Sequence, residues 1–260
     1  MIQCNFEAFT MNQWLDDLRI ATAFLTRLPM PHPDGARPES FARAQRLFPL
    51  VGAGIGAAVG LFCLLLRASG VPDLAAAALA LGGAALLTGA LHEDGLADVA
   101  DGFGGGRDVA AKLEIMRDSR LGTYGALALV VSFAAKLAAI AAIPDGLVVQ
   151  SLIAAHALGR GVLPWIAISL PYARKDGLAA NAGRPDGTIA AVAAGIALVI
   201  AVLALPLGSA LLAAIAAGAS AVIMMQLARR QIGGQTGDVL GGAEQVVESA
   251  ILVLLAARLG

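Results

Sequence analysis

The amino-acid sequence predicts an all-α, polytopic membrane protein with about seven transmembrane helices and one N-terminal interfacial helix. Hydrophobic residues make up 58% of its 260 residues and charged residues only 14%, whereas soluble domains carry about 25% charged residues. The mean hydropathy is +0.77, and stretches near the roughly 20 apolar residues that a spanning helix needs recur along the chain. We therefore expect a single integral-membrane domain over residues 1–260. The net charge of −1 gives no reason to expect a nucleic-acid partner.

The segment before the first apolar stretch suits a helix that lies in the membrane interface. Its apolar residues are Trp14, Leu15, Leu18, Phe24 and Leu25. The segment does not resemble a secretory signal peptide, because residues 1–18 contain Glu7, Asp16 and Asp17 but no Lys or Arg. Cys4 and Cys63 form no CxxC pattern, so we expect neither a disulfide framework nor a zinc site.

Seven apolar stretches are candidate spans. They cover residues 47–66, 72–91, 121–143, 147–170, 188–205, 208–227 and 243–259. The last stretch is the weakest, because Glu244 and Glu248 lie in its first two turns. Residues 206–208 predict a tight hairpin between the fifth and sixth spans.

The distribution of Lys and Arg supports this count and predicts an orientation. The segments before the first, third, fifth and seventh spans hold five, four, three and two of these residues, whereas the opposite side holds only Arg67 and Arg258. Because Lys and Arg concentrate in cytoplasmic loops, we expect the N-terminus inside and the C-terminus outside. The remaining two, Lys136 and Arg160, lie within spans.

An acidic run follows the second span, in the sequence HEDGLADVADG at residues 92–102. Asp94, Asp98 and Asp101 are spaced i, i+4 and i+7, which places three carboxylates on one face of a helix. Like charges at this spacing repel each other, and a hard cation such as Mg²⁺, Mn²⁺ or Ca²⁺ would offset that repulsion. A solvated acidic loop is the alternative. His92 could be a ligand, a proton shuttle or an interfacial cap.

Two further segments of this loop suit phosphate groups. Residues 102–106 are rich in glycine and are followed by Arg107. This pattern predicts either a turn that approaches phosphate or a flexible hinge. In residues 113–125, helical spacing would place Glu114 with Asp118 on one face and Arg117 with Arg120 on another. Carboxylates beside arginines suit metal-bridged phosphates, although ordinary surface ion pairs would give the same pattern.

More ionisable residues lie near or within the later spans. Asp238, Glu244 and Glu248 could face the first acidic run from across the bundle, although a carboxylate at a helix N-terminus is also favoured by the helix dipole. His156 and Arg160 share a face at i, i+4. Ionisable groups inside a membrane are candidates for function, so we expect them to line a polar cavity or to pair internally.

Two runs in this order, HEDGLADVADGFGGG and LEIMRDSRLGTYG, closely resemble the cobalamin synthases, the adenosylcobinamide-GDP ribazoletransferase family. Supporting matches are TRLP at residues 26–29, FPLVGAGIG at 48–56 and GDVLGGAEQVVE at 237–248. Members of this family typically have a neutral residue where this chain has Glu93, so Glu93 is left out of the predicted site.

The resemblance implies a Mg²⁺-dependent transferase of the bacterial inner membrane, with its site facing the cytoplasm. It would join adenosylcobinamide-GDP and α-ribazole, or its 5′-phosphate, to give adenosylcobalamin, or its 5′-phosphate, and GMP. We expect the metal at Asp94, Asp98 and Asp101, and catalytic roles for these three residues with His92, Glu244 and Glu248. Substrate-binding roles are expected for Arg107, Glu114, Arg117, Asp118, Arg120, Arg160 and Asp238. The number of metal ions, the general base and the oligomeric state stay open.

Two other functional classes share some of these sequence features. A CDP-alcohol phosphotransferase also uses spaced aspartates at a membrane face, typically in a D-G-x-x-A-R pattern, but here Ala97 is followed by Asp98. A transporter would use Lys136, His156 and Arg160 to line a path. Transporters usually hold their functional polar groups near the midplane and often contain inverted repeats, whereas no repeat is visible in this sequence.

Overall fold

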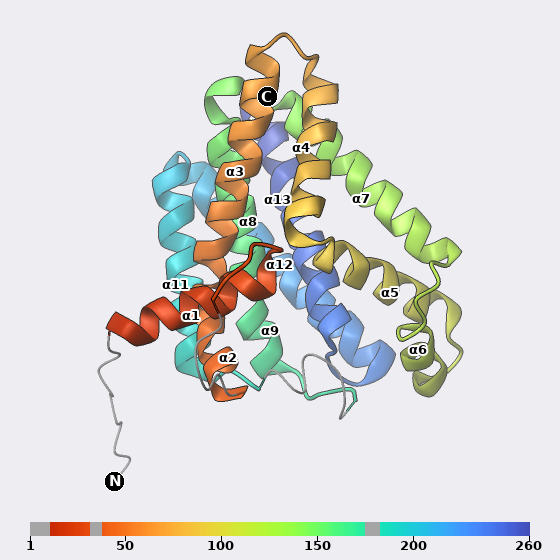
Figure 1. Ribbon diagram of the computed structural model, residues 1–260. Helices are drawn as coiled ribbons and strands as arrows, with labels where there is room; N and C mark the ends of the chain where they lie inside the picture. Colours follow the sequence, from red (N-terminus) through yellow and green to blue (C-terminus); the bar gives the residue numbers. More distant parts are fainter. Residues whose placement is uncertain (1–10, 32–37, 175–182) are drawn as a thin grey trace.

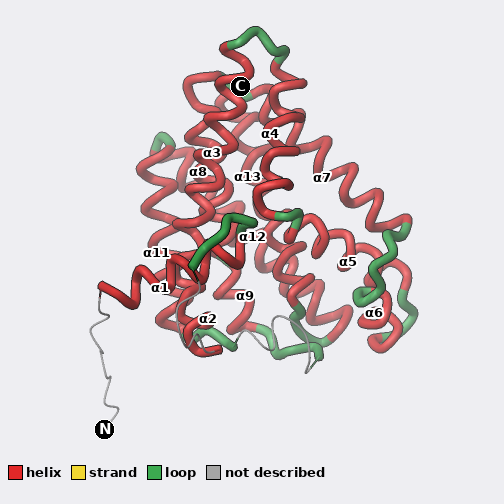
Figure 2. Tube along the Cα trace, viewed as in Figure 1, coloured by secondary structure: helices red, strands yellow, loops and turns green. Residues whose placement is uncertain are grey.

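The computed structural model describes residues 11–31, 38–174 and 183–260, and helices dominate all three ranges (Figures 1 and 2). Within these ranges the extended pairing is limited to an isolated bridge between Tyr172 and Gln235. The predicted all-α fold is therefore confirmed. Four residues used in the sequence predictions, Cys4, Glu7, Arg37 and Lys175, lie outside the described residues.

Long helices run roughly parallel along the molecule, with α1 lying across them (Figure 1). The first elements are α1 (Met11–Leu25), α2 (Pro38–Ala44), the 3-10 helix η1 (Gln45–Leu47) and α3 (Phe48–Ala68). The others are α4 (Asp73–Thr88), α5 (Leu91–Gly105), α6 (Val109–Ile115), α7 (Thr123–Ala142), α8 (Asp145–Gly161), α9 (Leu163–Ser169), α11 (Gly187–Ala204), α12 (Leu207–Ile232) and α13 (Gly237–Leu259). The helix expected at the N-terminal end is thus confirmed as α1.

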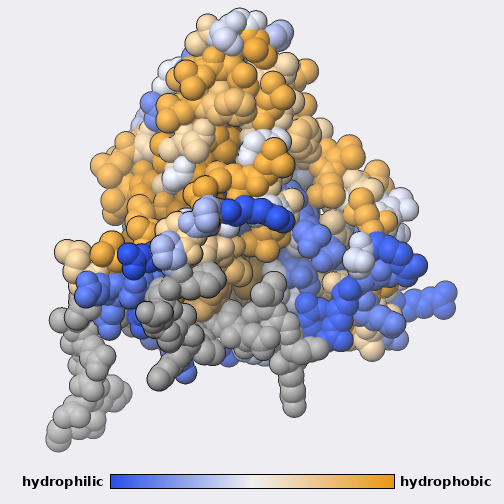
Figure 3. Space-filling view, viewed as in Figure 1, coloured by the Kyte–Doolittle hydropathy of each residue, from blue (hydrophilic) through white to orange (hydrophobic). Residues whose placement is uncertain are grey.

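Six helical segments among the described residues are long and apolar enough to cross a membrane, which makes the chain an integral membrane protein. They correspond to predicted spans one and three to seven, with α8 and α9 together forming the fourth. Apolar side chains cover the upper part of the face in Figure 3, and hydrophilic side chains gather toward its lower end. The predicted hairpin between the fifth and sixth spans is confirmed, since α11 ends at Ala204 and α12 begins at Leu207.

The second predicted span requires a correction. Helix α4 has only 16 residues, and the chain then bends by 93° into α5. The bend lies at Gly89 and Ala90, which adopt positive φ angles of 68° and 55°. A Cβ at Gly89 would collide with the Arg27 side chain. The count reaches seven spans only if α4 and α5 together form one broken span.

Two helix ends also differ from the prediction. Helix α12 continues to Ile232, so Arg229 and Arg230 lie in its last turn and not in a loop. Helix α13 begins at Gly237, six residues before the predicted span, because the Thr236 side chain caps it by accepting the Val239 N–H at 3.2 Å. The early start places Asp238 in the first helical turn.

Helices α3 and α8 pack closely through glycines spaced four residues apart. A Cβ at Gly56 would collide with the Leu152 carbonyl oxygen, and one at Gly60 would lie 2.7 Å from Val149 Cα. At Gly52 it would collide with the His156 carbonyl oxygen and lie 2.7 Å from Arg160 Cδ. Small residues permit such close approach of helices in membranes. The FPLVGAGIG run therefore fixes the part of α8 that carries His156 and Arg160.

Replacing Gly56 with Leu should lower the melting temperature of the purified protein in detergent by several degrees. The new side chain would meet backbone atoms of α8, and overpacking of this kind costs about 1–3 kcal/mol or more. The matched control is Gly54→Leu on the same helix, because a Cβ at Gly54 meets nothing within 4 Å. Equal melting temperatures for the two variants would contradict the packing argument.

Candidate functional site

The two acidic stretches of the sequence meet where α5 packs on α13. A Cβ at Gly95 would lie 2.8 Å from the Asp238 carbonyl oxygen and 3.1 Å from Gly241 Cα. The absence of side chains at both glycines therefore lets the two backbones touch. This contact confirms that Asp238 faces the first acidic run from across the bundle.

Asp94, Asp98, Asp238 and Arg174 form what we call the acidic pocket. Asp94, Arg174 and Asp238 line a cavity of about 150 Å³, together with His92 and the aromatic rings of Phe24, Phe41 and Phe48. Arg174 donates a hydrogen bond to Asp238 at 3.2 Å. The short β-bridge of Tyr172 with Gln235 holds the segment that carries Arg174 beside the start of α13.

Asp98, which lies on α5 after the chain has turned away from α4, is half-buried among other carboxylates. Burial, followed by the negative charges of Asp94, Asp238 and Asp101, raises the pKa of Asp98 to about 7. A carboxyl group with neighbours of the same sign gains from protonation or from a bound cation. Hard oxygen donors of this kind are the ligands that Mg²⁺ prefers.

Asp101 has a different set of contacts from those of Asp94 and Asp98. One of its carboxylate oxygens accepts the Gly122 N–H at 2.7 Å, and the other accepts the Gly125 N–H at 2.8 Å. Both donors lie at the start of α7, where a carboxylate is favoured by unpaired N–H groups and the helix dipole. Asp101 therefore fixes α7 against α5, and this contact explains the glycines of the LGTYG run.

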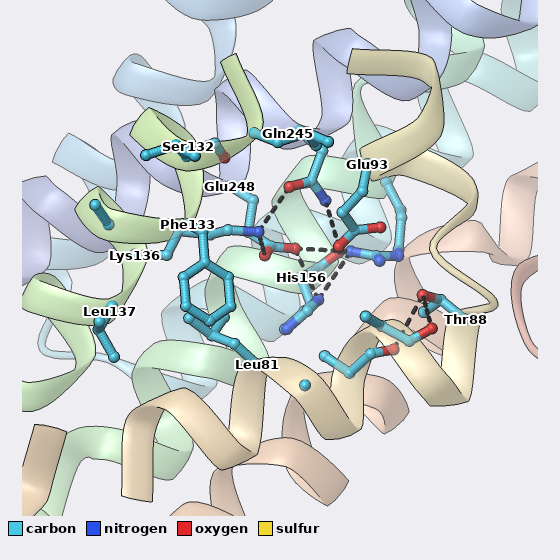
Figure 4. A pocket seen from close by; sticks show the side chains of 17 residues that line it. Leu81, Thr88, Glu93, Ser132, Phe133, Lys136, Leu137, His156, Gln245 and Glu248 are labelled. Carbon is cyan, nitrogen blue, oxygen red and sulfur yellow. Dashed lines mark hydrogen bonds and ion pairs between the residues drawn. The ribbon is translucent and has the colours of Figure 1, made fainter. Parts of the chain in front are cut away.

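The second group of ionisable residues, which we call the buried cluster, consists of His92, Lys136, His156, Arg160, Glu244 and Glu248. All six are at most 4% exposed. Glu248 contacts His156 Nδ1 at 2.8 Å, and Arg160 Nη1 and Lys136 Nζ at 3.2 Å each. Glu244 pairs with Arg160 and lies 3.5 Å from His92 Nδ1. Figure 4 shows part of this network.

The predicted internal pairing of the intramembrane residues is confirmed for Lys136, His156 and Arg160. The cavity that these three residues line is largely apolar and not the polar cavity that was predicted. Ligand atoms of His156, Glu244 and Glu248 lie within 4.8 Å of one another, which is close enough to hold a metal ion. However, Arg160 Nη1 already contacts all three of these side chains. A cation there would have to compete with a guanidinium, so the acidic pocket suits a metal ion better.

The structure does not show the helical arrangement predicted for residues 113–120. Helix α6 ends at Ile115, so Glu114 and Asp118 do not share a helical face, and neither do Arg117 and Arg120. Asp118 instead pairs locally with Arg120 at 2.5 Å. Arg107, Glu114, Arg117 and Arg120 are all exposed. They lie around α6, beyond the C-terminal end of α5.

The prediction of a glycine-rich turn or hinge after α5 is also wrong, because most of these glycines are helical. Gly102, Gly104 and Gly105 belong to the last turn of α5, and only Gly106 lies beyond the helix end. Their role is close packing, because a Cβ at Gly102 would collide with the Met116 side chain and one at Gly104 would lie 2.6 Å from the Tyr124 ring. The glycines thus let α6 and the start of α7 approach α5.

Arg174, Gln245 and Glu93 belong to the contacts of the acidic pocket and the buried cluster but are not among the residues predicted from the sequence. Gln245 accepts a hydrogen bond from Lys136 at 2.6 Å and donates to Glu93 at 3.3 Å and to Glu244 at 3.0 Å. Gln245 directly follows Glu244 in the sequence, and this position could have indicated a role for it in the site. Arg174 could not be selected from the sequence, because its proximity to Asp238 depends on the bridge between Tyr172 and Gln235.

Comparisons with known proteins agree on one family. The family model described as cobalamin-5-phosphate synthase matches residues 17–256. A protein of Bradyrhizobium diazoefficiens named adenosylcobinamide-GDP ribazoletransferase is 46% identical, over 95% of this chain and 96% of its own length. Proteins with the same name are 41% identical in Sinorhizobium medicae, over 95% and 98%, and 44% identical in Rhizobium etli, over 94% and 97%. No solved structure matches this chain significantly.

Proposed function

Because the chain belongs to the cobalamin-5-phosphate synthase family, we propose that it transfers adenosylcobinamide phosphate from adenosylcobinamide-GDP to α-ribazole, or to its 5′-phosphate, at the acidic pocket. The family assembles the nucleotide loop of cobalamin, and the chain is a transferase of this pathway. The carrying observation is the convergence of Asp94, Asp98 and Asp238 beside Arg174.

The acidic pocket fits the Mg²⁺ ion that the family resemblance implies. Its carboxylates are hard oxygen donors. Burial, followed by the negative charges of the neighbouring aspartates, raises the pKa of Asp98, so a bound cation would stabilise its charged form. In this proposal Asp94, Asp98 and Asp238 hold the ion, whereas Asp101 positions α7. A bound Mg²⁺ would neutralise the diphosphate and stabilise the leaving phosphate oxygen.

The proposed reaction is one phosphoryl transfer. A ribose hydroxyl oxygen of α-ribazole forms a bond to the phosphorus atom attached to cobinamide, and the bond from that phosphorus to the oxygen of GMP breaks. GMP leaves with the bonding electrons, and a carboxylate of the acidic pocket accepts the hydroxyl proton. Arg174 binds the diphosphate, because a guanidinium donates hydrogen bonds to phosphate oxygens. The chain thus supplies positioning and charge, which dominate catalysis of such transfers.

The proposal places the acidic pocket on the cytoplasmic side of the bacterial inner membrane. The arginines of α2 and η1, Arg174 after α9, and the two arginines at the end of α12 gather at the same end as the acidic pocket. Arg67 at the end of α3 and Arg258 at the end of α13 lie at the other end. The positive-inside rule then orients the polar end toward the cytoplasm. The diphosphate donor would reach the acidic pocket from that compartment.

The proposal is tested with purified protein, adenosylcobinamide-GDP, α-ribazole and MgCl₂, with GMP release as the readout. We expect release that requires both substrates and that stops when a chelator removes the divalent ion. A transporter would release no GMP under these conditions. Release without α-ribazole would indicate hydrolysis of the donor and would contradict the transfer.

A further inference from the structure

A second cavity of about 420 Å³ lies between α4 and α7, and we call it the side pocket. Its apolar walls include Leu81, Gly82 and Ala85 on α4, and Val130, Phe133 and Ala134 on α7. Val130 is 64% and Phe133 is 43% exposed, as expected of side chains that face lipid. The side pocket therefore opens sideways toward the bilayer.

The inner end of the side pocket is polar. Glu93, Lys136, His156, Arg160, Gln245 and Glu248 line it (Figure 4). Among the described residues, the acceptor Glu93 Oε2 and the donor Arg160 Nε are buried without a hydrogen-bond partner. Arg160 as a whole is only 1% exposed. Buried groups of this kind usually have partners, so a ligand that offers both a donor and an acceptor would complete the site.

The charges at the inner end exclude a strongly anionic ligand group. Lys136 is paired with Glu248, and Arg160 is paired with both Glu244 and Glu248. These two cations therefore already face carboxylates, and a phosphate placed there would add to the negative charge in a poorly solvated site. The side pocket suits a ligand with an apolar body and neutral hydrogen-bonding groups.

The side pocket adjoins the acidic pocket across the first turn of α5. His92 and Asp94 line the acidic pocket, and Glu93 between them lines the side pocket. Gln245 links Glu93 to Glu244, which in turn lies beside His92. A ligand in the side pocket would therefore lie next to the carboxylates at which the transfer is proposed.

We infer that the side pocket binds the aromatic base of the acceptor nucleoside, so that α-ribazole enters from the bilayer side while the anionic donor enters from the polar end. This inference rests on the proposed function. The benzimidazole base is apolar and carries a ring nitrogen that accepts a hydrogen bond, and the ribose hydroxyls donate hydrogen bonds. These groups match the donor at Arg160 Nε and the acceptor at Glu93 Oε2.

The test fills the side pocket without disturbing the packing. A Cβ at Gly82 meets nothing within 4 Å, and the same holds at Gly195 on α11, outside the side pocket. We expect Gly82→Phe and Ala134→Phe each to raise the KM for α-ribazole at least tenfold, with the KM for adenosylcobinamide-GDP within twofold of the unsubstituted protein. Gly195→Phe is the matched control and should change neither. Equilibrium binding of radiolabelled α-ribazole without donor should weaken in the same two variants.

Three outcomes would overturn the inference. The first is an unchanged KM for α-ribazole in both variants, which is also the result expected if a phospholipid occupies the side pocket. The second is a rise in the KM for the donor alone, and the third is unchanged binding of α-ribazole. Failure of the unsubstituted protein to release GMP would instead count against the proposed function, so the two failures are distinguishable.

Discussion

Asp98→Asn should abolish GMP release while the protein still inserts into the membrane and purifies normally. The substitution keeps the size of the side chain but removes a negative charge from the group formed with Asp94 and Asp238. Losing one electrostatic contact to a transition state typically costs about 10²–10³ in rate, and losing a metal ligand should cost at least as much. The measurement is initial-rate GMP release at saturating substrates.

The control for this variant is Asp73→Asn. Asp73 is 63% exposed and pairs with Arg67 at the end of the bundle opposite the acidic pocket. Its rate should stay within about twofold of the unsubstituted protein, because Asp73 contacts neither the acidic pocket nor the buried cluster and Arg67 keeps its ion pair with Asp145. A fully active Asp98→Asn enzyme would remove Asp98 from the reaction.

Arg160→Met should give the largest loss of stability. Arg160 contacts Glu244, Glu248 and His156 in a cluster that is almost fully buried. Removing Arg160 leaves the buried carboxylates of Glu244 and Glu248 without one of their cationic partners. Breaking a buried ion pair in this way costs about 3–5 kcal/mol. We expect a lower melting temperature in detergent and poor recovery of monodisperse protein.

Two further variants make the stability test specific. Arg230→Met replaces an exposed arginine at the end of α12 and should melt like the unsubstituted protein. Adding Glu244→Gln to Arg160→Met removes one of the stranded charges and should recover part of the lost stability. If Arg160→Met alone melts at the unsubstituted temperature, the ion pairs of the buried cluster do not stabilise the fold.

Features that depend on neighbouring residues in sequence were predictable. The i, i+4 spacing of Asp94 and Asp98 requires only that residues 91–105 form a helix, which they do. The apolar stretches likewise located the spanning helices, because burial in lipid requires a continuous run of apolar side chains. The resemblance to the cobalamin synthases, carried by runs near both acidic stretches, is confirmed by the family match.

Features that depend on long-range contacts were not predictable. Asp238 reaches the acidic pocket, whereas Glu244 and Glu248 reach the buried cluster, and this division follows from the close contact of Gly95 with the start of α13. Asp101 shares the helical face of Asp94 and Asp98, but its oxygens accept N–H groups of Gly122 and Gly125. Spacing along one helix does not reveal which other helix will present donors to it.

The measurement that tests the central claim most directly is binding of Mn²⁺, as a stand-in for Mg²⁺, to the purified metal-free protein. We expect saturable binding that weakens at least tenfold in Asp98→Asn and stays unchanged in Asp73→Asn. Because the pKa of Asp98 is raised to about 7, protonation should also weaken binding as the pH falls below that value. Absence of binding, or equal affinity in Asp98→Asn and the unsubstituted protein, would contradict the acidic pocket as the metal site.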